Sequence, residues 1–345
     1  MDYHFQNLVF EGGGVKGIAY VGAMQVLEEK GILRTITRVG GTSAGAINAV
    51  LVALGYPNKE QLTILKKLDF NNFMDDSWGI VRDSERLVKE YGWYKGDFFH
   101  EWLGDLIKRK LKNPNATFTD LKEAGLPDLY LYGTNLSTRF GEIFSYEHTP
   151  HERIADAARI SMSIPLFFAA VRNARNDVYV DGGVLSNYPI QVFDRLKYIQ
   201  VEQQARMAMD TDYYQKVNRP FLKKHPDSSP YAYNRQTLGF RLDSKQEIAA
   251  FRDRREPAHY EVGDFFDYIK ALVNTIIESQ GNQHLHSDDW QRTVYIDTLG
   301  VGTTDFDISD KKKKALLQSG REGTMAYFNW FDDQESDPVN RPPNH

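Results

Sequence analysis

The sequence of 345 residues contains no cysteine, and this absence excludes several classes of protein. Disulfide-stapled domains, zinc sites with thiolate ligands and enzymes with a cysteine nucleophile all need that residue. Long apolar runs are missing too, since no segment approaches the roughly 18 apolar residues of a membrane-spanning helix. The first residues lack the basic and apolar regions of a cleavable signal peptide. We therefore expect a soluble protein, either cytoplasmic or secreted without a cleavable signal peptide.

An excess of charge of one sign is also lacking. The formal net charge is −5, and no basic stripe marks a surface for nucleic acid. A weakly negative chain has little general attraction to anionic membranes, so a transient contact with a membrane surface would have to be local. Hydrophobic residues make up 41% of the chain and aromatic residues 13%. This is enough for a sizeable core and excludes the disordered class.

Strand and helix patterns alternate near the N-terminus. Residues 6–10 form a short apolar run that ends in glycines, and a mostly apolar helix is predicted over 18–30. A second strand at 35–39 precedes a second helix over 44–54. This order predicts an α/β fold with a central, mostly parallel sheet sandwiched by helices.

The rest of the chain divides by composition. We expect a core over residues 1–202 that includes strands at 128–134, 139–145, 177–180 and 197–202. Residues 203–263 are polar and weakly periodic, which indicates an insertion or lid. Residues 264–333 read as helices and a strand that complete the domain, and 334–345 as a disordered tail.

Three short motifs carry the functional signal. Gly12-Gly13-Gly14-Val15-Lys16-Gly17 lies between a strand and a helix, where backbone amides can converge on a negative oxygen. Gly41-Thr42-Ser43-Ala44-Gly45 is a G-x-S-x-G elbow that places a serine at a helix N-terminus. Asp181-Gly182-Gly183 directly follows a strand. Taken singly, the first motif is also compatible with a tight turn and the third with an ordinary Asp-Gly turn.

A serine nucleophile needs a neighbouring base. None of the nine histidines stands in a glycine-rich or strand-end context, so none is marked as that base. The three motifs, in this order, resemble the patatin-like phospholipase family. Further similar segments are Gly133-Thr134-Asn135-Leu136, residues 161–167 and Asn187-Tyr188-Pro189.

The resemblance implies a patatin-like three-layer architecture and a Ser–Asp dyad that works without histidine. Ser43 is then the nucleophile and Asp181 the base, and the oxyanion hole comes from Gly12, Gly13, Gly14, Lys16 and Gly17. The implied activity is hydrolysis of lipid or phospholipid esters, of the phospholipase A or lysophospholipase type. No calcium-loop pattern is present, so we expect no metal or cofactor.

Other interpretations stay open at this stage. The same fold could serve as a non-catalytic, lipid-binding scaffold. G-x-G-x-x-G at 12–17 also fits an NAD(P)-binding oxidoreductase, although the acidic residue expected about 20 positions later is missing. For the lipid itself, Phe70, Phe73, Met74, Trp78 and Ile80 are candidates to line an acyl channel, and equally to be ordinary core residues.

Overall fold

The computed structural model describes residues 3–68, 89–244, 261–284 and 288–333, together with Asn72 and His259. The five apolar candidates for an acyl channel, Phe70, Phe73, Met74, Trp78 and Ile80, lie outside the described residues. The predicted tail over 334–345 lies outside them as well.

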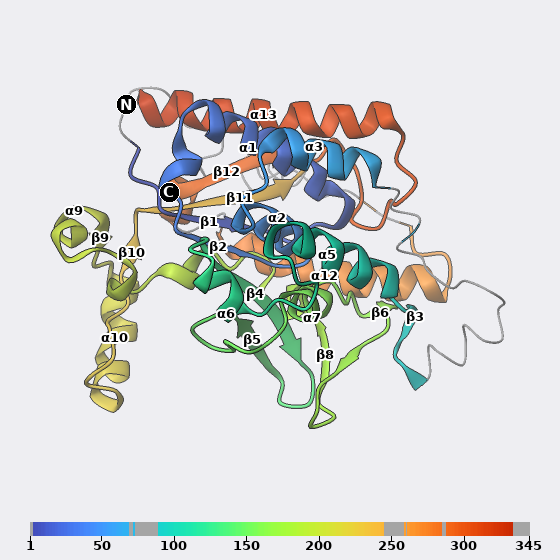
Figure 1. The fold of residues 1–345 in the computed structure, drawn as a ribbon, viewed down its shortest axis with the longest axis horizontal. Coiled ribbons are helices and arrows are strands. Elements are labelled where there is room, and N and C mark those ends of the chain that lie inside the picture. The colour runs from blue at the N-terminus through green and yellow to red at the C-terminus, as the bar shows by residue number, and fades with distance from the viewer. Residues whose placement is uncertain are drawn as a thin grey trace.

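An eight-stranded sheet lies at the centre of the described chain (Figure 1). Its order is β12-β11-β1-β2-β4-β8-β7, and β5 pairs with the outer half of β4. The strands are β1 (Asn7–Phe10), β2 (Arg38–Gly41), β4 (Asp128–Asn135), β5 (Phe140–Phe144), β7 (Val171–Arg172), β8 (Val178–Asp181), β11 (Thr237–Asp243) and β12 (Thr293–Asp297). The five strands from β12 to β4 run parallel, whereas β5, β7 and β8 pair antiparallel. A central, mostly parallel sheet in an α/β fold is thereby confirmed.

Helices cover one face of this sheet. The main ones are α1 (Ala19–Glu29), α2 (Ala44–Ala53), α7 (Ile154–Ser161) and α13 (Asp310–Asp332). Helix α2 is apolar almost all round because it is enclosed, packing against β1, β2 and β4. More peripheral helices are α3 (Asn58–Lys67), α5 (Asp97–Leu111), α6 (Phe118–Glu123) and α12 (Phe265–His284). None of the helices in the described ranges combines the length and apolar character needed to span a bilayer.

A smaller core covers the opposite face. Val9 and Tyr130 point away from α2 and pack with Tyr188, Ile190 and Phe193. These partners come from short 3-10 turns rather than from a long helix. The sheet is therefore enclosed on both faces.

Helices α1 and α13 pack at unusually short range along the top of Figure 1. A Cβ atom built on Gly22 would lie 1.9 Å from the carbonyl oxygen of Leu317, and one built on Gly320 would lie 1.8 Å from that of Ala19. Only glycine permits this approach. Helix α13 therefore packs against α1 with their backbones in close contact.

The prediction of an insertion or lid over residues 203–263 is wrong for part of this segment. Residues 237–243 form β11, a fully buried strand that pairs with β1 and β12 in the central sheet. The polar residues in it misled the prediction, because Arg241 is buried with ionic partners rather than solvated. The predicted strand at 197–202 is also wrong, since this stretch forms two 3-10 turns.

The remainder of that segment forms a lobe that projects from the sheet. It contains α9 (Gln204–Met207), β9 (Ala208–Met209), α10 (Asp212–Lys224) and β10 (Tyr233–Asn234) (Figure 1). A buried ionic cluster ties its base to the C-terminal part of the chain. Arg292 donates to Asp194 at 2.6 and 2.7 Å and to Asp289 at 2.6 Å.

Candidate active site

Ser43 stands at the turn between β2 and α2. Its backbone has φ 54° and ψ −127°, a left-handed conformation that is strained for a non-glycine residue. A Cβ on Gly41 would lie 2.3 Å from the carbonyl oxygen of Gly45, and one on Gly45 would lie 2.4 Å from that of Phe10. The G-x-S-x-G glycines are therefore required by close backbone contacts, and the serine is held at the helix N-terminus.

The register of the strands places Asp181 at the same height along the sheet as Ser43. In the β2–β4 pair Gly41 is opposite Leu131, and in the β4–β8 pair Gly133 is opposite Asp181. Ser43 is two residues beyond Gly41, and Gly133 is two residues beyond Leu131. The serine and the aspartate are thus level across the longer strand β4. Because β8 is antiparallel to β4, Asp181 does not lie at the carboxyl end of a parallel strand.

The segment after α7 holds the two residues together. The backbone N–H of Ser43 donates to Oγ of Ser161 at 3.0 Å, and the N–H of Asp181 donates to the carbonyl oxygen of Ser163 at 2.8 Å. Between them, the sulfur of Met162 lies 3.8 Å from Oγ of Ser43. The motif at 161–167, noted from the sequence only as a similarity, is thus the bridge between the two predicted catalytic residues.

The carboxyl of Asp181 is almost completely buried, at 1% exposure. Burial raises its pKa to about 7, although the N–H of Gly183 and the hydroxyl of Ser43 act to lower it. Oδ1 accepts from the N–H of Gly183 at 2.7 Å, whereas Oδ2 accepts no hydrogen bond of normal geometry from the described residues. One carboxylate oxygen is therefore fixed by the backbone and the other is available to a proton.

The residues of the glycine-rich loop make different contacts. The N–H of Gly12 donates to the carbonyl oxygen of Asn187 at 3.0 Å, so it is not free to bind a substrate oxygen. Gly14 turns the chain with φ +56° against the backbone of Thr303, and Gly17 packs against Ala44. Gly13 lines the cavity beside Ser43, and its N–H has no hydrogen-bond partner among the described residues.

Lys16 is the cation of this loop. Its side chain is buried, at 9% exposure, and lines the same cavity as Ser43. No ion pair or hydrogen bond of its ammonium group occurs within the described ranges. The carboxyl of Glu11 lies near enough to interact with it electrostatically, and the ammonium remains able to take a polar or anionic ligand in the cavity.

A charged cluster behind the loop was not found from the sequence. Oε2 of Glu11 accepts from the N–H of Leu242 at 2.8 Å, and Oε1 lies 3.8 Å from the guanidinium of Arg241. Arg241 in turn contacts Asp243 at 2.6 Å. Burial raises the pKa of Glu11 despite the nearby arginine. The cluster joins the ends of β1 and β11 directly beneath the glycines. Its only sequence signal was charged residues alternating with apolar ones in β11.

The structure thus brings most of the predicted site residues into one small cavity of about 40 Å³. Ser43, Asp181, Gly12, Gly13 and Lys16 line it, whereas Gly14 and Gly17 support it from behind. None of the histidines in the described ranges lines it. No group of metal-binding side chains is found among the described residues either.

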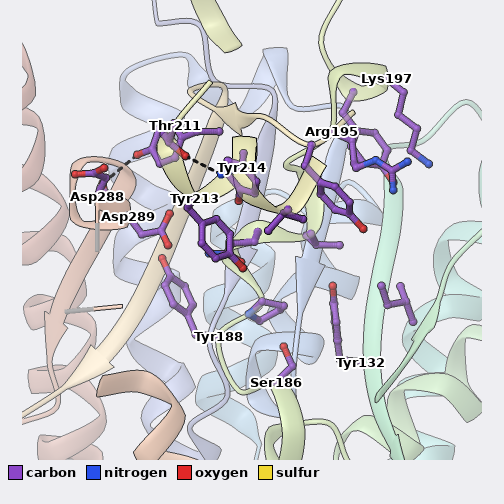
Figure 2. Close-up of a pocket in the computed structure, with 18 of the residues that line it drawn as sticks. Tyr132, Ser186, Tyr188, Arg195, Lys197, Thr211, Tyr213, Tyr214, Asp288 and Asp289 are labelled. Carbon is purple, nitrogen blue, oxygen red and sulfur yellow. Dashed lines mark hydrogen bonds between the residues drawn. The ribbon is translucent and has the colours of Figure 1, made fainter. Parts of the chain in front are cut away.

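A second and much larger cavity, of about 1400 Å³, lies on the other side of Asn187. Figure 2 shows Tyr132, Ser186 and Tyr188 facing Tyr213 and Tyr214 of the projecting lobe. Asn187 lines both cavities, so the two are separated at Asn187, which follows the short helix α8 (Gly183–Ser186). None of the predicted site residues lines the larger cavity.

Comparison with known proteins places this geometry in context. The model of the patatin-like phospholipase family matches residues 8–194. The chain is 30% identical to the uncharacterised protein YqhO of Bacillus subtilis, over 93% of this chain and 97% of that protein. It is 27% identical to the probable lipid hydrolase 463L of invertebrate iridescent virus 6, over 55% of this chain and 63% of the viral protein.

Among solved structures, VipD from Legionella pneumophila has a similar fold. The TM-score is 0.59 at 18% sequence identity, and the match covers 94% of this chain and 67% of VipD. The extent of the family match, together with a relative that is similar over nearly its whole length, identifies the chain as a member of the patatin-like phospholipase family, a family of lipid hydrolases.

Proposed function

We propose that this protein hydrolyses carboxylic ester bonds of lipids with Ser43 as nucleophile and Asp181 as base. The observation that supports this most directly is that a strained serine at a helix N-terminus and a buried aspartate line one cavity beside a glycine loop. Family membership favours this hydrolase over the dinucleotide-binding alternative.

The reaction starts with proton transfer to the partnerless oxygen of Asp181. As Oγ of Ser43 attacks the ester carbonyl, its proton passes to Oδ2 and a tetrahedral oxyanion forms. When this intermediate collapses, Asp181 returns the proton to the departing alcohol and an acyl-enzyme remains. Water then repeats the two steps, which releases the fatty acid and restores Ser43. A pKa of about 7 makes Asp181 a far better base than an ordinary aspartate.

Oxyanion stabilisation would come from the loop and from the helix. The N–H of Gly13 has no hydrogen-bond partner in the described structure, and the N–H of Ala44 lies in the first turn of α2, at the positive end of the helix dipole. Removal of one such donor commonly lowers kcat by ~10²–10³. Lys16 adds a positive charge in the same cavity, where it would also attract the phosphate of a phospholipid.

The small cavity volume bears on the substrate. About 40 Å³ accommodates the reacting group but not two acyl chains. Its apolar side is formed by Ile164, Leu242 and Ile277, so the chain of the bound acyl group would leave the site along these residues. This arrangement suits a phospholipid or lysophospholipid whose chains remain outside the reacting cavity.

Labelling with a fluorophosphonate tests the proposal. We expect the wild-type protein to be labelled and to cleave phospholipid esters, and Ser43→Ala to lose both properties while remaining folded. Ser228→Ala, in the lobe, is the matched control and should be labelled normally. Failure to label the folded wild type would favour a non-catalytic scaffold. A folded His100→Ala or His148→Ala variant without activity would contradict the dyad.

A further inference from the structure

Two hairpin turns project together beyond the edge of the sheet that carries the candidate site. One joins β4 to β5 and the other joins β7 to β8 (Figure 1). They are held side by side: the N–H of Leu136 donates to the carbonyl oxygen of Val178 at 2.8 Å, and the N–H of Val178 donates to Oγ of Ser137 at 3.0 Å. The two turns therefore form one rigid projection.

Large apolar side chains are exposed on this projection. Phe140 is 72% exposed and Leu136 is 48% exposed, both at the β4–β5 turn. Leu185, from the turn after Asp181, is 47% exposed and adjoins the hairpin, since a Cβ on Gly141 would lie 4.0 Å from its own. Contiguous exposed apolar groups of this kind mark an interaction surface rather than scattered surface residues.

Cationic side chains surround the apolar ones. Arg139, Arg172 and Arg175 are all exposed at the two turns. Two carboxylates, those of Asp177 and Glu142, lie among them. Asp177 lies 3.5 Å from Arg175, and Glu142 accepts from the hydroxyl of Tyr179 at 2.9 Å. Three arginines against these two carboxylates leave the projection with a net charge of +1, on a chain whose net charge is −5.

The projection is also close to the candidate site. Strand β8 leads from its turn to Asp181 within the four residues Val178–Asp181. Three steps of extended strand span roughly 10 Å. A flat surface that contacted the turns would therefore lie about one lipid headgroup layer from the cavity that holds Ser43.

We propose that these residues, named here the hairpin surface (Leu136, Arg139, Phe140, Arg172, Arg175 and Leu185), dock the protein onto an anionic lipid bilayer. Phe140 and Leu136 enter the interface between headgroups and chains, and the arginines contact lipid phosphates. The arginines are the feature that distinguishes an anionic bilayer from an apolar protein partner. Delivery of a lipid ester to Ser43 from this bilayer rests on the proposed function, whereas the docking itself does not.

Sedimentation with vesicles tests the docking. The full chain is mixed with vesicles of phosphatidylcholine, or of phosphatidylcholine with phosphatidylserine, and the bound fraction is measured. We expect the wild type to prefer the phosphatidylserine vesicles. Phe140→Ser should weaken binding by at least about tenfold, because the serine side chain no longer transfers an aromatic ring from water into the apolar interface. Arg139→Ala should weaken binding about fivefold on the anionic vesicles and little on the others.

Matched variants on the far lobe are the controls. Val201 is 77% exposed and Arg206 is also exposed, so Val201→Ser and Arg206→Ala should bind vesicles as the wild type does. Equal loss in the control variants, no binding by the wild type, or unchanged binding by Phe140→Ser and Arg139→Ala would each overturn the proposal. So would a Phe140→Ser effect on oligomeric state in place of vesicle binding, which would make the surface a protein interface.

The two proposals can fail separately. Phe140→Ser should react with a fluorophosphonate in solution at the wild-type rate, because its side chain does not line the cavity. If Ser43→Ala retained ester hydrolysis, the proposed function would fail while the vesicle measurements stood. If labelling were normal and vesicle binding were insensitive to the hairpin surface, only the docking would fail.

Discussion

Asp181 is buried although its proposed role as a base requires a negative charge. It is buried at 1% exposure, which favours the neutral carboxyl, and its pKa is raised to about 7. A base is useful only when it is deprotonated, so the folded protein must hold a buried charge at the pH where it acts. We infer that the site is maintained at the expense of stability.

This gives a stability prediction with a definite sign. The native pKa of about 7 lies above the ~3.9 of aspartate in an unfolded chain. The folded state therefore binds the proton more tightly, and the stability that this group contributes is lost as pH rises from about 4 through 7. Asp181→Asn, which cannot ionise, should become more stable relative to the wild type as pH increases.

Urea unfolding at about pH 5 and about pH 8 measures this difference. The variant should gain in the free energy of unfolding mainly at the higher pH, while its turnover falls by several orders of magnitude. Glu11→Gln provides a comparison, because burial raises the pKa of that carboxyl as well. An Asp181→Asn effect that is identical at both pH values would show that the native carboxyl titrates in its ordinary range.

At the residue scale, the site residues that belong to short, unusual motifs were predictable from the sequence. Ser43 and the glycines were recognisable because tight turns leave few choices of residue. Arg241 and Asp243 were not, because a buried charge looks like a solvated one until its partner is known. The engaged amide of Gly12 was also hidden, since its acceptor, Asn187, is 175 positions away in the chain.

Among the elements, the α1–α13 pair shows how the end of the chain completes the fold. Helix α13 packs on α1 and β12, and the exposed ion pair between Arg321 and Glu29, at 2.8 Å, lies beside the glycine contact. The close approach at Gly22 and Gly320 leaves no space for a methyl group. This packing is therefore specific to the two helices rather than a general apolar contact.

Gly320→Ala should separate the two helices and destabilise the protein. We expect a loss of about 1–3 kcal/mol in the free energy of unfolding, which is typical of an overpacked core. Met325→Ala, on an exposed position of α13, is the control and should change it by less than about 0.5 kcal/mol. Thermal and urea unfolding measure the free energy of unfolding of the two variants. Similar stability in both would mean that α13 can shift at no cost.

Helices and strands with a clear period were predictable, and those without one were not. The alternation of strand and helix patterns around β1 and β2 led to the correct fold class. Strand β11 was missed because Gly239 and Arg241 interrupt its apolar run. Residues 197–202 have a strand-like sequence, but tertiary contacts impose 3-10 turns, and propensity is too weak to resist them.

For the whole molecule, the Arg292 cluster connects parts that are distant in sequence. Its guanidinium joins Asp194, next to the lobe, to Asp289, which precedes β12. All three side chains are buried. Loss of the arginine would leave two carboxylates without a counter-ion in the interior, which is strongly unfavourable.

Arg292→Met should therefore lower the free energy of unfolding by about 3–5 kcal/mol. Arg321→Met, which breaks the exposed pair with Glu29, should lower it by no more than about 1 kcal/mol. Denaturant unfolding at neutral pH compares the two. Equal and small losses would indicate that water enters the Arg292 cluster and solvates the carboxylates left behind.

The antiparallel pairing of β8 has a consequence for how this molecule can vary. The distance between Ser43 and Asp181 depends on a ladder of main-chain hydrogen bonds, in which a slip of a single residue would turn Asp181 to the opposite face. Of the turn residues, Leu136 adds one bond to this ladder, from its N–H to the carbonyl oxygen of Val178, and the other described turn residues form no main-chain bond between β4 and β8. If the protein docks as proposed, the length and composition of these other turn residues can change from one descendant to the next, and the preferred lipid surface can change with them, while Ser43 and Asp181 keep their places.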